Sequence, residues 1–188
     1  MNIYALDESP QQLVSYLTDR HLASAMKNAA QMMCAAHVKH DGISRARLRI
    51  PGLMVPANLR MATMDPWTIW CMQRAANYEW LWRVLAYGCD EFLHRAGHSH
   101  AFAIDGQFDW SLRRQLAYPP LALASAMMLW PWRQPLPINV PMLYARDTAV
   151  ESYRLWYSQR YANGDDMEWH GCNKPPQWMK RTGVDCEA

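Results

Sequence analysis

Apolar residues recur at intervals of three and four over three long segments of the chain, which is the spacing of one helix face. In the first segment this stripe consists of Leu22, Met26, Ala29 and Met33. The segments predicted to be helical are residues 10–36, 66–95 and 149–162. Alternation typical of a strand is limited to residues 2–6, so we expect an all-α fold with a short N-terminal extended segment.

Capping residues indicate where these helices begin and end. Ser9 and Pro10 start a short helix that ends near Leu17, after which Thr18 or Asp19 caps the next helix. The other predicted starts are Asp65 with Pro66 and Thr148 with Glu151, and the predicted stops are Gly97 and Asn163–Gly164.

Two regions are expected to depart from regular helix. Residues 38–64 contain Pro51, Gly52 and Pro56, which predict irregular structure. The segment 66–95 is long for a globular helix, so we expect it to break near Gly88.

Length and charge limit the class of protein. A chain of 188 residues fits one domain, 1–188, with one buried core. The net charge of +2 creates no global field toward nucleic acid, so any such binding must come from local patches. The five cysteines form no CxxC pair, the opening residues lack a signal-peptide pattern, and no apolar run is long enough to span a bilayer. We therefore expect a reduced cytoplasmic protein without a membrane segment.

A polar stripe interrupts the apolar surroundings of the helix predicted to end near His37. Its members are His21, Ser24, Asn28 and Gln31. At about 100° per residue, these four side chains point in the same direction. Because histidine, serine and asparagine are mediocre helix formers, the stripe indicates either the wall of a functional site or side chains that satisfy neighbouring backbone groups.

Residues 43–60 carry a local excess of positive charge. The segment contains no acidic residue, and its basic residues are Arg45, Arg47, Arg49 and Arg60. It is predicted to be either a solvated loop or a strip that contacts nucleic-acid phosphates.

Two further clusters have both a structural and a functional interpretation. The aromatic residues of NYEWLWR, at 77–83, either pack in the core or form a stacking platform for an extruded base. The histidines of HRAGHSH cross a predicted helix end and lack a carboxylate or cysteine partner at a suitable spacing. We therefore predict no metal site there.

The stretch NIYALDESPQQLVSYLTDRHLASAMKNAAQMMCAAH, at residues 2–37, resembles the opening of a family of small phage and microbial proteins. Its positions on the family pattern are Asp7, Asp19, Arg20, His21, Gln31 and His37. Later positions on that pattern are Trp70, Arg74, Asn77, Trp80, His100, Tyr153, Arg154 and Tyr157, followed by PPQWM near the end. The resemblance thus covers most of the chain through short motifs.

That family is similar in turn to the phage pyrimidine-dimer DNA glycosylase, endonuclease V, which implies an endonuclease V-like helical fold. There an early helix carries Asp-x-His and a catalytic Glu seven residues after the His, and the N-terminal amine is the nucleophile. In this chain Asn28 occupies the position of the Glu, and an amide does not ionise. Asn2 is too large for efficient removal of Met1, so excision through an imine is expected to be feeble or absent.

The resemblance implies a protein that acts on DNA, with phage DNA as its partner and the host cytoplasm as its location. It would recognise a pyrimidine, modified or not, for excision or modification of the base. His21 would carry protons because a histidine pKa lies near neutrality, while Asn28 and Gln31 would hold the base edge. The other implied substrate contacts are Arg20, Arg74, Asn77, Trp80, His100, Tyr153, Arg154 and Tyr157, with Arg45, Arg47, Arg49 and Arg60 on DNA phosphates.

Two alternatives stay open beside base excision. One is a group transferase that acts on hypermodified thymidine in phage DNA. The other is a non-catalytic module that binds nucleic acid or protein and has kept the fold. No cofactor is implied, and the oligomeric state is left open.

Overall fold

The protein is described by a computed structural model that covers residues 2–55, 59–104, 111–126, 131–165, 167–170 and 175–179. Within these ranges it is all-helical and contains no β-strand. The elements are α1 (Pro10–Tyr16), α2 (Asp19–Asp41), α3 (Ile43–Arg49), α4 (Leu59–Ala62), α5 (Pro66–Gln73), α6 (Ala75–Ala96), α7 (Leu112–Gln115), α8 (Leu121–Ala126), the 3₁₀ helix η1 (Met142–Tyr144) and α9 (Ala149–Ala162).

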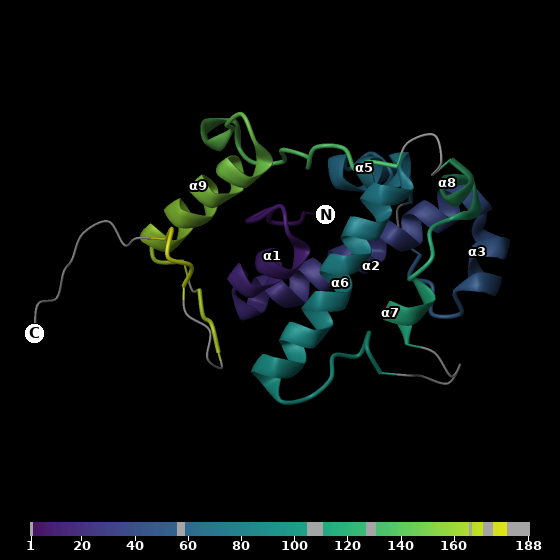
Figure 1. Ribbon diagram of the computed structural model, residues 1–188, viewed down its shortest axis with the longest axis horizontal. Helices are drawn as coiled ribbons and strands as arrows, with labels where there is room; N and C mark the ends of the chain where they lie inside the picture. Colours follow the sequence, from purple (N-terminus) through teal and green to yellow (C-terminus); the bar gives the residue numbers. More distant parts are fainter. Residues whose placement is uncertain are drawn as a thin grey trace, which may run out of the picture.

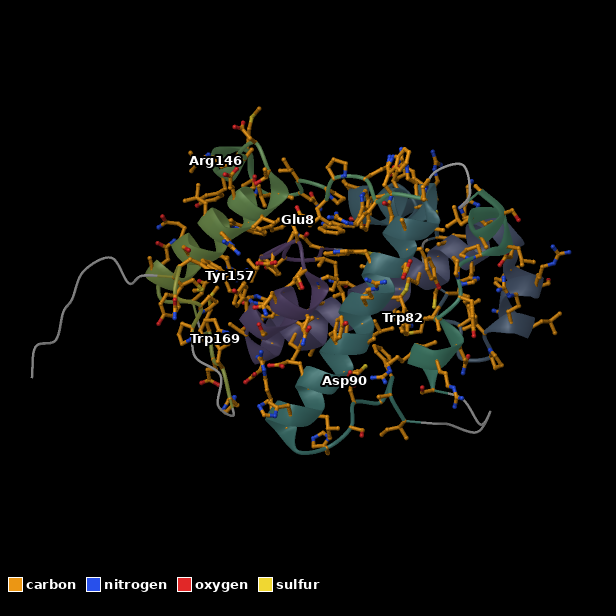
Figure 2. The ribbon with its side chains drawn as sticks, in the orientation of Figure 1. Glu8, Trp82, Asp90, Arg146, Tyr157 and Trp169 are labelled. Carbon is orange, nitrogen blue, oxygen red and sulfur yellow. The ribbon has the colours of Figure 1, made fainter. Side chains whose placement is uncertain are left out.

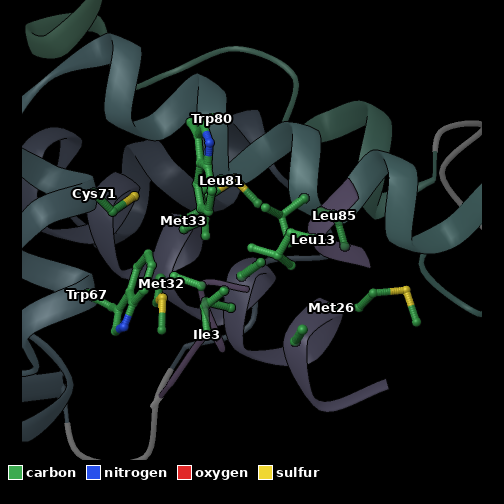
Figure 3. Close-up of a cluster of buried hydrophobic side chains, with 14 of the residues drawn as sticks. Ile3, Leu13, Met26, Met32, Met33, Trp67, Cys71, Trp80, Leu81 and Leu85 are labelled. Carbon is green, nitrogen blue, oxygen red and sulfur yellow. The ribbon is translucent and has the colours of Figure 1, made fainter. Parts of the chain in front are cut away.

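The two longest helices, α2 and α6, cross in the middle of the molecule (Figure 1). Helix α9 lies at one end of the view, and α3, α7 and α8 lie at the other. Buried side chains from α1, α2, α5, α6, α8 and α9 belong to one apolar cluster. Figure 3 shows part of this cluster, including Ile3 from the N-terminal segment.

The predicted capping residues begin their helices as expected. Ser9 accepts a hydrogen bond from the backbone N–H of Gln12, and Thr18 accepts one from His21. Asp65 and Thr148 cap α5 and α9 in the same way. Each of these caps satisfies a backbone N–H that the first helical turn leaves without a partner.

The predicted break near Gly88 is wrong, because α6 continues through that residue to Ala96. A Cβ atom at Gly88 would lie 2.7 Å from the Cγ of Met26 on α2. The glycine therefore permits close approach of two helices and does not interrupt one. The actual interruption is at Arg74, whose extended backbone (φ −146°, ψ 146°) separates α5 from α6.

The prediction that residues 38–64 are irregular is correct for residues 50–55, around Pro51 and Gly52, and wrong for the helical stretches on either side. Helix α2 extends to Asp41, and α3 and α4 occupy much of the remainder. Gly42, at φ 78°, ends α2, and α3 begins without a side-chain cap. The start of α3 therefore lacks the local signal that marks the starts of α1, α2, α5 and α9.

Residues 2–6 were expected to be extended; they form neither a helix nor a strand, and the Leu6 N–H donates to the Tyr4 carbonyl at 2.8 Å. They are attached to both α2 and α9 by side-chain hydrogen bonds that involve Asn2, Tyr4 and Leu6. This segment brings residues from the two ends of the chain together. None of the helices in the described ranges combines the length and the apolar character needed to cross a membrane.

Candidate functional site

The solvent-facing side of α2 carries polar and positively charged side chains in one line. Arg20, Ser24 and Lys27 are exposed, and Gln31 is half-buried. At about 100° per residue these four positions fall within roughly 60° of one another around the helix. Lys27 was not among the residues predicted from the sequence, although it lies seven positions after Arg20 and thus on the same face.

Asn28 lies beside this line and holds the N-terminal segment. Its Nδ2 donates to the carbonyl oxygen of Asn2 at 2.8 Å. The side chain of Asn2 accepts a hydrogen bond from the Tyr153 hydroxyl at 2.7 Å and donates to the carbonyl of Asn139 at 3.2 Å. Residue 2 is therefore fixed between α2, α9 and the extended segment that precedes α9.

His21 is largely buried on the side of α2 that faces α9. Its Nδ1 lies 2.8 Å from the Thr18 hydroxyl and 2.9 Å from the Tyr157 hydroxyl, and the Tyr4 ring centroid is 4.6 Å from its own. Figure 2 shows Tyr157 between α9 and the body of the molecule. Burial, followed by the positive charges of Arg160 and Arg20, lowers the pKa of His21 to about 4.

The two hydroxyl groups at His21 Nδ1 are themselves part of a chain of hydrogen bonds. The Thr18 hydroxyl accepts the backbone N–H of His21, and the Tyr157 hydroxyl accepts the backbone N–H of Thr18. A hydroxyl oxygen has two lone pairs and one proton, so each hydroxyl can either donate to Nδ1 or accept a hydrogen bond from it. The proton-carrier role was predicted from a pKa near neutrality, which this environment removes. At neutral pH His21 is therefore a neutral imidazole, with one N–H donor and one acceptor nitrogen.

Three residues implied by the resemblance lie in the same region as His21. Tyr157 contacts the imidazole, and Tyr153 accepts a hydrogen bond from Trp67 Nε1 at 3.0 Å. Arg154 donates to the carbonyl of Leu6 at 2.7 Å and to the carboxylate of Asp7 at 2.9 Å. Their described contacts hold the N-terminal segment against α9.

Three other predicted residues lie at the junction of α5 and α6. Asn77 is fully buried, donates to the carbonyl of Trp70 and to the side chain of Gln134, and accepts the Gln134 backbone N–H. Trp80 is buried and donates to the Glu8 carbonyl, and Arg74 donates to the Trp132 carbonyl. These contacts attach neighbouring segments to the junction. A base could bind Asn77 only if its present hydrogen bonds broke.

His100 lies after α6 and is likewise engaged locally. Its Nδ1 accepts the backbone N–H of Phe102 at 3.2 Å, and its ring packs edge-on against Phe92. Across the described ranges, no group of three or more His, Cys, Asp or Glu side chains is arranged to hold a metal ion. Cys34, Cys71 and Cys89 are buried free thiols, and Cys172 and Cys186 lie outside the described residues.

The four predicted phosphate-binding arginines do not form one continuous row. On α3, the helical geometry places Arg45 and Arg49 on one flank and Arg47 on the other, with Leu48 exposed between the flanks. Arg45 and Arg47 are exposed, whereas Arg49 is half-buried and donates to Asp41 at 3.1 Å. Arg60 is exposed on α4.

A second buried histidine marks a cluster that the residue analysis did not identify. His37 Nδ1 lies 3.1 Å from the Asp41 carboxylate, and its Nε2 lies 3.0 Å from the Tyr78 hydroxyl. The same hydroxyl lies 3.0 Å from the carbonyl oxygen of Leu116. The spacing of His37 and Asp41, one helical turn apart, is the local signal that identifies half of this cluster.

No protein-family profile, curated protein or solved structure matches this chain. The resemblance to the pyrimidine-dimer glycosylase, including its fold, therefore stays a prediction. The function is therefore inferred from the geometry of α2 and the residues around it.

Proposed function

We propose that this protein binds DNA through the exposed face of α2 and recognises a pyrimidine, modified or not, in the manner of a pyrimidine-dimer glycosylase. The observation that carries the proposal is the charge of that face. Residues 20–40 of α2 include no acidic residue, and the exposed line contains Arg20 and Lys27 next to hydrogen-bonding amides.

Each kind of side chain on this face has a role in such a complex. Arg20 and Lys27 would contact phosphates, which position a protein on nucleic acid. Asn28 and Gln31 offer both donors and acceptors, as recognition of a base edge requires. Exposed Arg45, Arg47 and Arg60 would add phosphate contacts from α3 and α4.

Recognition without base excision is favoured by the surroundings of His21 and Asn28. Excision requires a group that protonates the leaving base or stabilises the developing cation. Asn28 does not ionise, and the pKa of His21 falls to about 4. A binding module is therefore the first form of the proposal, and group transfer to a modified thymidine is the second.

Replacing the positively charged residues of α2 with neutral ones tests whether its exposed face binds DNA. Arg20→Gln and Lys27→Gln should each weaken binding to a 20-base-pair duplex about fivefold and reduce the slope of log K against log salt by about 1. The matched control is Arg83→Gln, because Arg83 is exposed on α6 and pairs with Glu79 away from α2. Fluorescence anisotropy over a salt series measures all three. Unchanged affinity in both α2 variants would exclude this face.

A second experiment separates binding from chemistry. The protein should bind duplexes with a thymine dimer or a modified pyrimidine but give no covalent adduct when borohydride is added. Loss of a base modification in His21→Ala would instead support group transfer. A strong borohydride adduct in the unaltered protein would contradict the binding module and show that excision proceeds without the Glu. If Asn28→Glu restored excision, the lapsed-glycosylase origin would be supported.

A further inference from the structure

A cleft lies between α3 and α7, near the end of the molecule opposite α9 (Figure 1). Its volume is about 360 Å³, which is within the range of small-molecule sites. The Gln115 side chain accepts the backbone N–H of Gly52 at 3.0 Å and so joins the two walls. The cleft is therefore supported by a specific contact between segments distant in sequence.

The walls of the cleft present two guanidinium groups. Arg49 lines one side and Arg114 lines the other. Arg49 is held by the Asp41 carboxylate through Nη1, and its side chain is 30% exposed, so its other N–H groups remain available for a ligand. Asp41 is only 3% exposed and its Oδ2 contacts both His37 and Arg49. The charged side chains that line the cleft are thus Arg49 and Arg114.

Apolar and aromatic side chains complete the cleft. Leu48 is 84% exposed and Tyr118 is 68% exposed, although both belong to residue types that are usually more buried. The ring of Tyr118 offers a face for stacking, which is tolerant of base identity. Two guanidiniums beside an exposed aromatic ring match a ligand that joins a phosphate to a planar base.

We propose that this cleft binds a nucleotide unit, with its phosphate on Arg49 and Arg114 and its base stacked on Tyr118. The unit is either a free nucleoside monophosphate or one nucleotide of a single strand, since both carry this chemistry. The site is separate from the α2 face, so it does not depend on DNA binding by Arg20 and Lys27.

Isothermal titration calorimetry of the full chain tests the proposal with thymidine 5′-monophosphate, thymidine and inorganic phosphate. The monophosphate should bind at least tenfold more tightly than either part alone. Arg49→Gln should weaken it about tenfold, and Tyr118→Ala about fivefold or more. Arg83→Gln is the control and should leave the affinity unchanged, because Arg83 pairs with Glu79 on α6 and does not line the cleft. The measured quantity is affinity for the monophosphate, so this result is separate from a failure of duplex binding at the α2 face.

An oligothymidylate of eight residues distinguishes the two sources of ligand. If it binds more tightly than the monophosphate and depends on the same two residues, the site accepts a single strand. If it does not displace the monophosphate, the site accepts a free nucleotide. Because Arg49→Gln also removes a partner of Asp41, Arg114→Gln serves as a second charge variant, with thermal melting as the check on folding. The absence of binding by both probes, or full affinity in Tyr118→Ala or in both arginine variants, would overturn the proposal.

Discussion

His21 and His37 occupy the same helix, α2, and each lies within hydrogen-bonding distance of a tyrosine hydroxyl. Their remaining partners differ. His21 Nδ1 is surrounded by the hydroxyls of Thr18 and Tyr157, whereas His37 Nδ1 faces the carboxylate of Asp41. One helical turn after each histidine, the residue is Ala25 in the first case and Asp41 in the second. That single difference makes one region neutral and the other ionic.

The consequences for protonation follow from these partners. Burial lowers the pKa of both imidazoles, but near His37 the Asp41 carboxylate opposes the effect. No such carboxylate hydrogen-bonds His21 among the residues described, and its pKa falls to about 4. The two histidines on one helix thus differ in their partners: His21 lies between two hydroxyl groups, and His37 contacts the carboxylate that pairs with Arg49 beside the cleft.

Replacing each histidine by leucine should give the largest contrast between the regions. His37→Leu removes a charged hydrogen bond from the buried Asp41 carboxylate and should lower the free energy of unfolding by about 3 to 4 kcal/mol. His21→Leu should cost only about 1 kcal/mol, because Tyr157 keeps the Thr18 N–H as a partner. Urea unfolding followed by circular dichroism measures both. Equal losses would show that the contact between His37 and the buried Asp41 carboxylate does not stabilise the fold more than the contacts of His21 do.

Acidification should also distinguish the two histidines, with a somewhat smaller effect on the free energy of unfolding. The folded pKa of His21, about 4, lies below its ordinary value of 6.5, so the unfolded chain takes up the proton first as pH falls. The free energy of unfolding should therefore decrease by about 2 to 3 kcal/mol from pH 6.5 to pH 4 on account of this residue, and level off below pH 4. His21→Leu should lack this part of the decrease and retain the part due to His37. A wild-type profile that matches the variant would refute the low pKa.

A change on α6, where it packs against the middle of α2, should have the smallest effect and leave both regions intact. In Gly88→Ala the new Cβ would press on the buried Met26 side chain. Because the cost of overpacking exceeds the gain in helix propensity, the free energy of unfolding should fall by about 1 kcal/mol. Chemical unfolding measures the loss. Combining the variant with Met26→Ala supplies the control, because space freed at Met26 should make the two effects non-additive. Additive costs would show that the helices do not meet at this point.

The helices that could be predicted from the sequence are those whose ends carry their own signals. Ser9 and Asp65 cap neighbouring N–H groups within three residues, so local sequence contains the whole interaction. The start of α3 after Gly42 has no such cap, and its helical structure was missed. At Gly88 the residue type was interpreted as a local break, whereas its reason is contact with Met26, 62 positions earlier in the sequence.

The candidate site likewise has features that local sequence predicts and features that depend on distant contacts. The helical period placed Asn28 and Gln31 on the polar side of α2, and both retain some exposure. The burial of His21 could not be predicted, because it depends on Tyr157, which is 136 positions away. Asn77 shows the same limitation, since its amide is engaged by Gln134 through a contact that no local pattern encodes.

The Tyr78 hydroxyl has one hydrogen atom and two acceptors, His37 Nε2 and the Leu116 carbonyl, each at 3.0 Å. When His37 is neutral and gives its Nδ1 proton to Asp41, the hydroxyl can point at either acceptor, and the other goes without. When His37 gains a second proton, Nε2 becomes a donor and the hydroxyl has a single choice, Leu116. The orientation of the Tyr78 O–H bond thus depends on the charge of the His37 imidazole, and it couples that charge to the backbone at Leu116, just after α7.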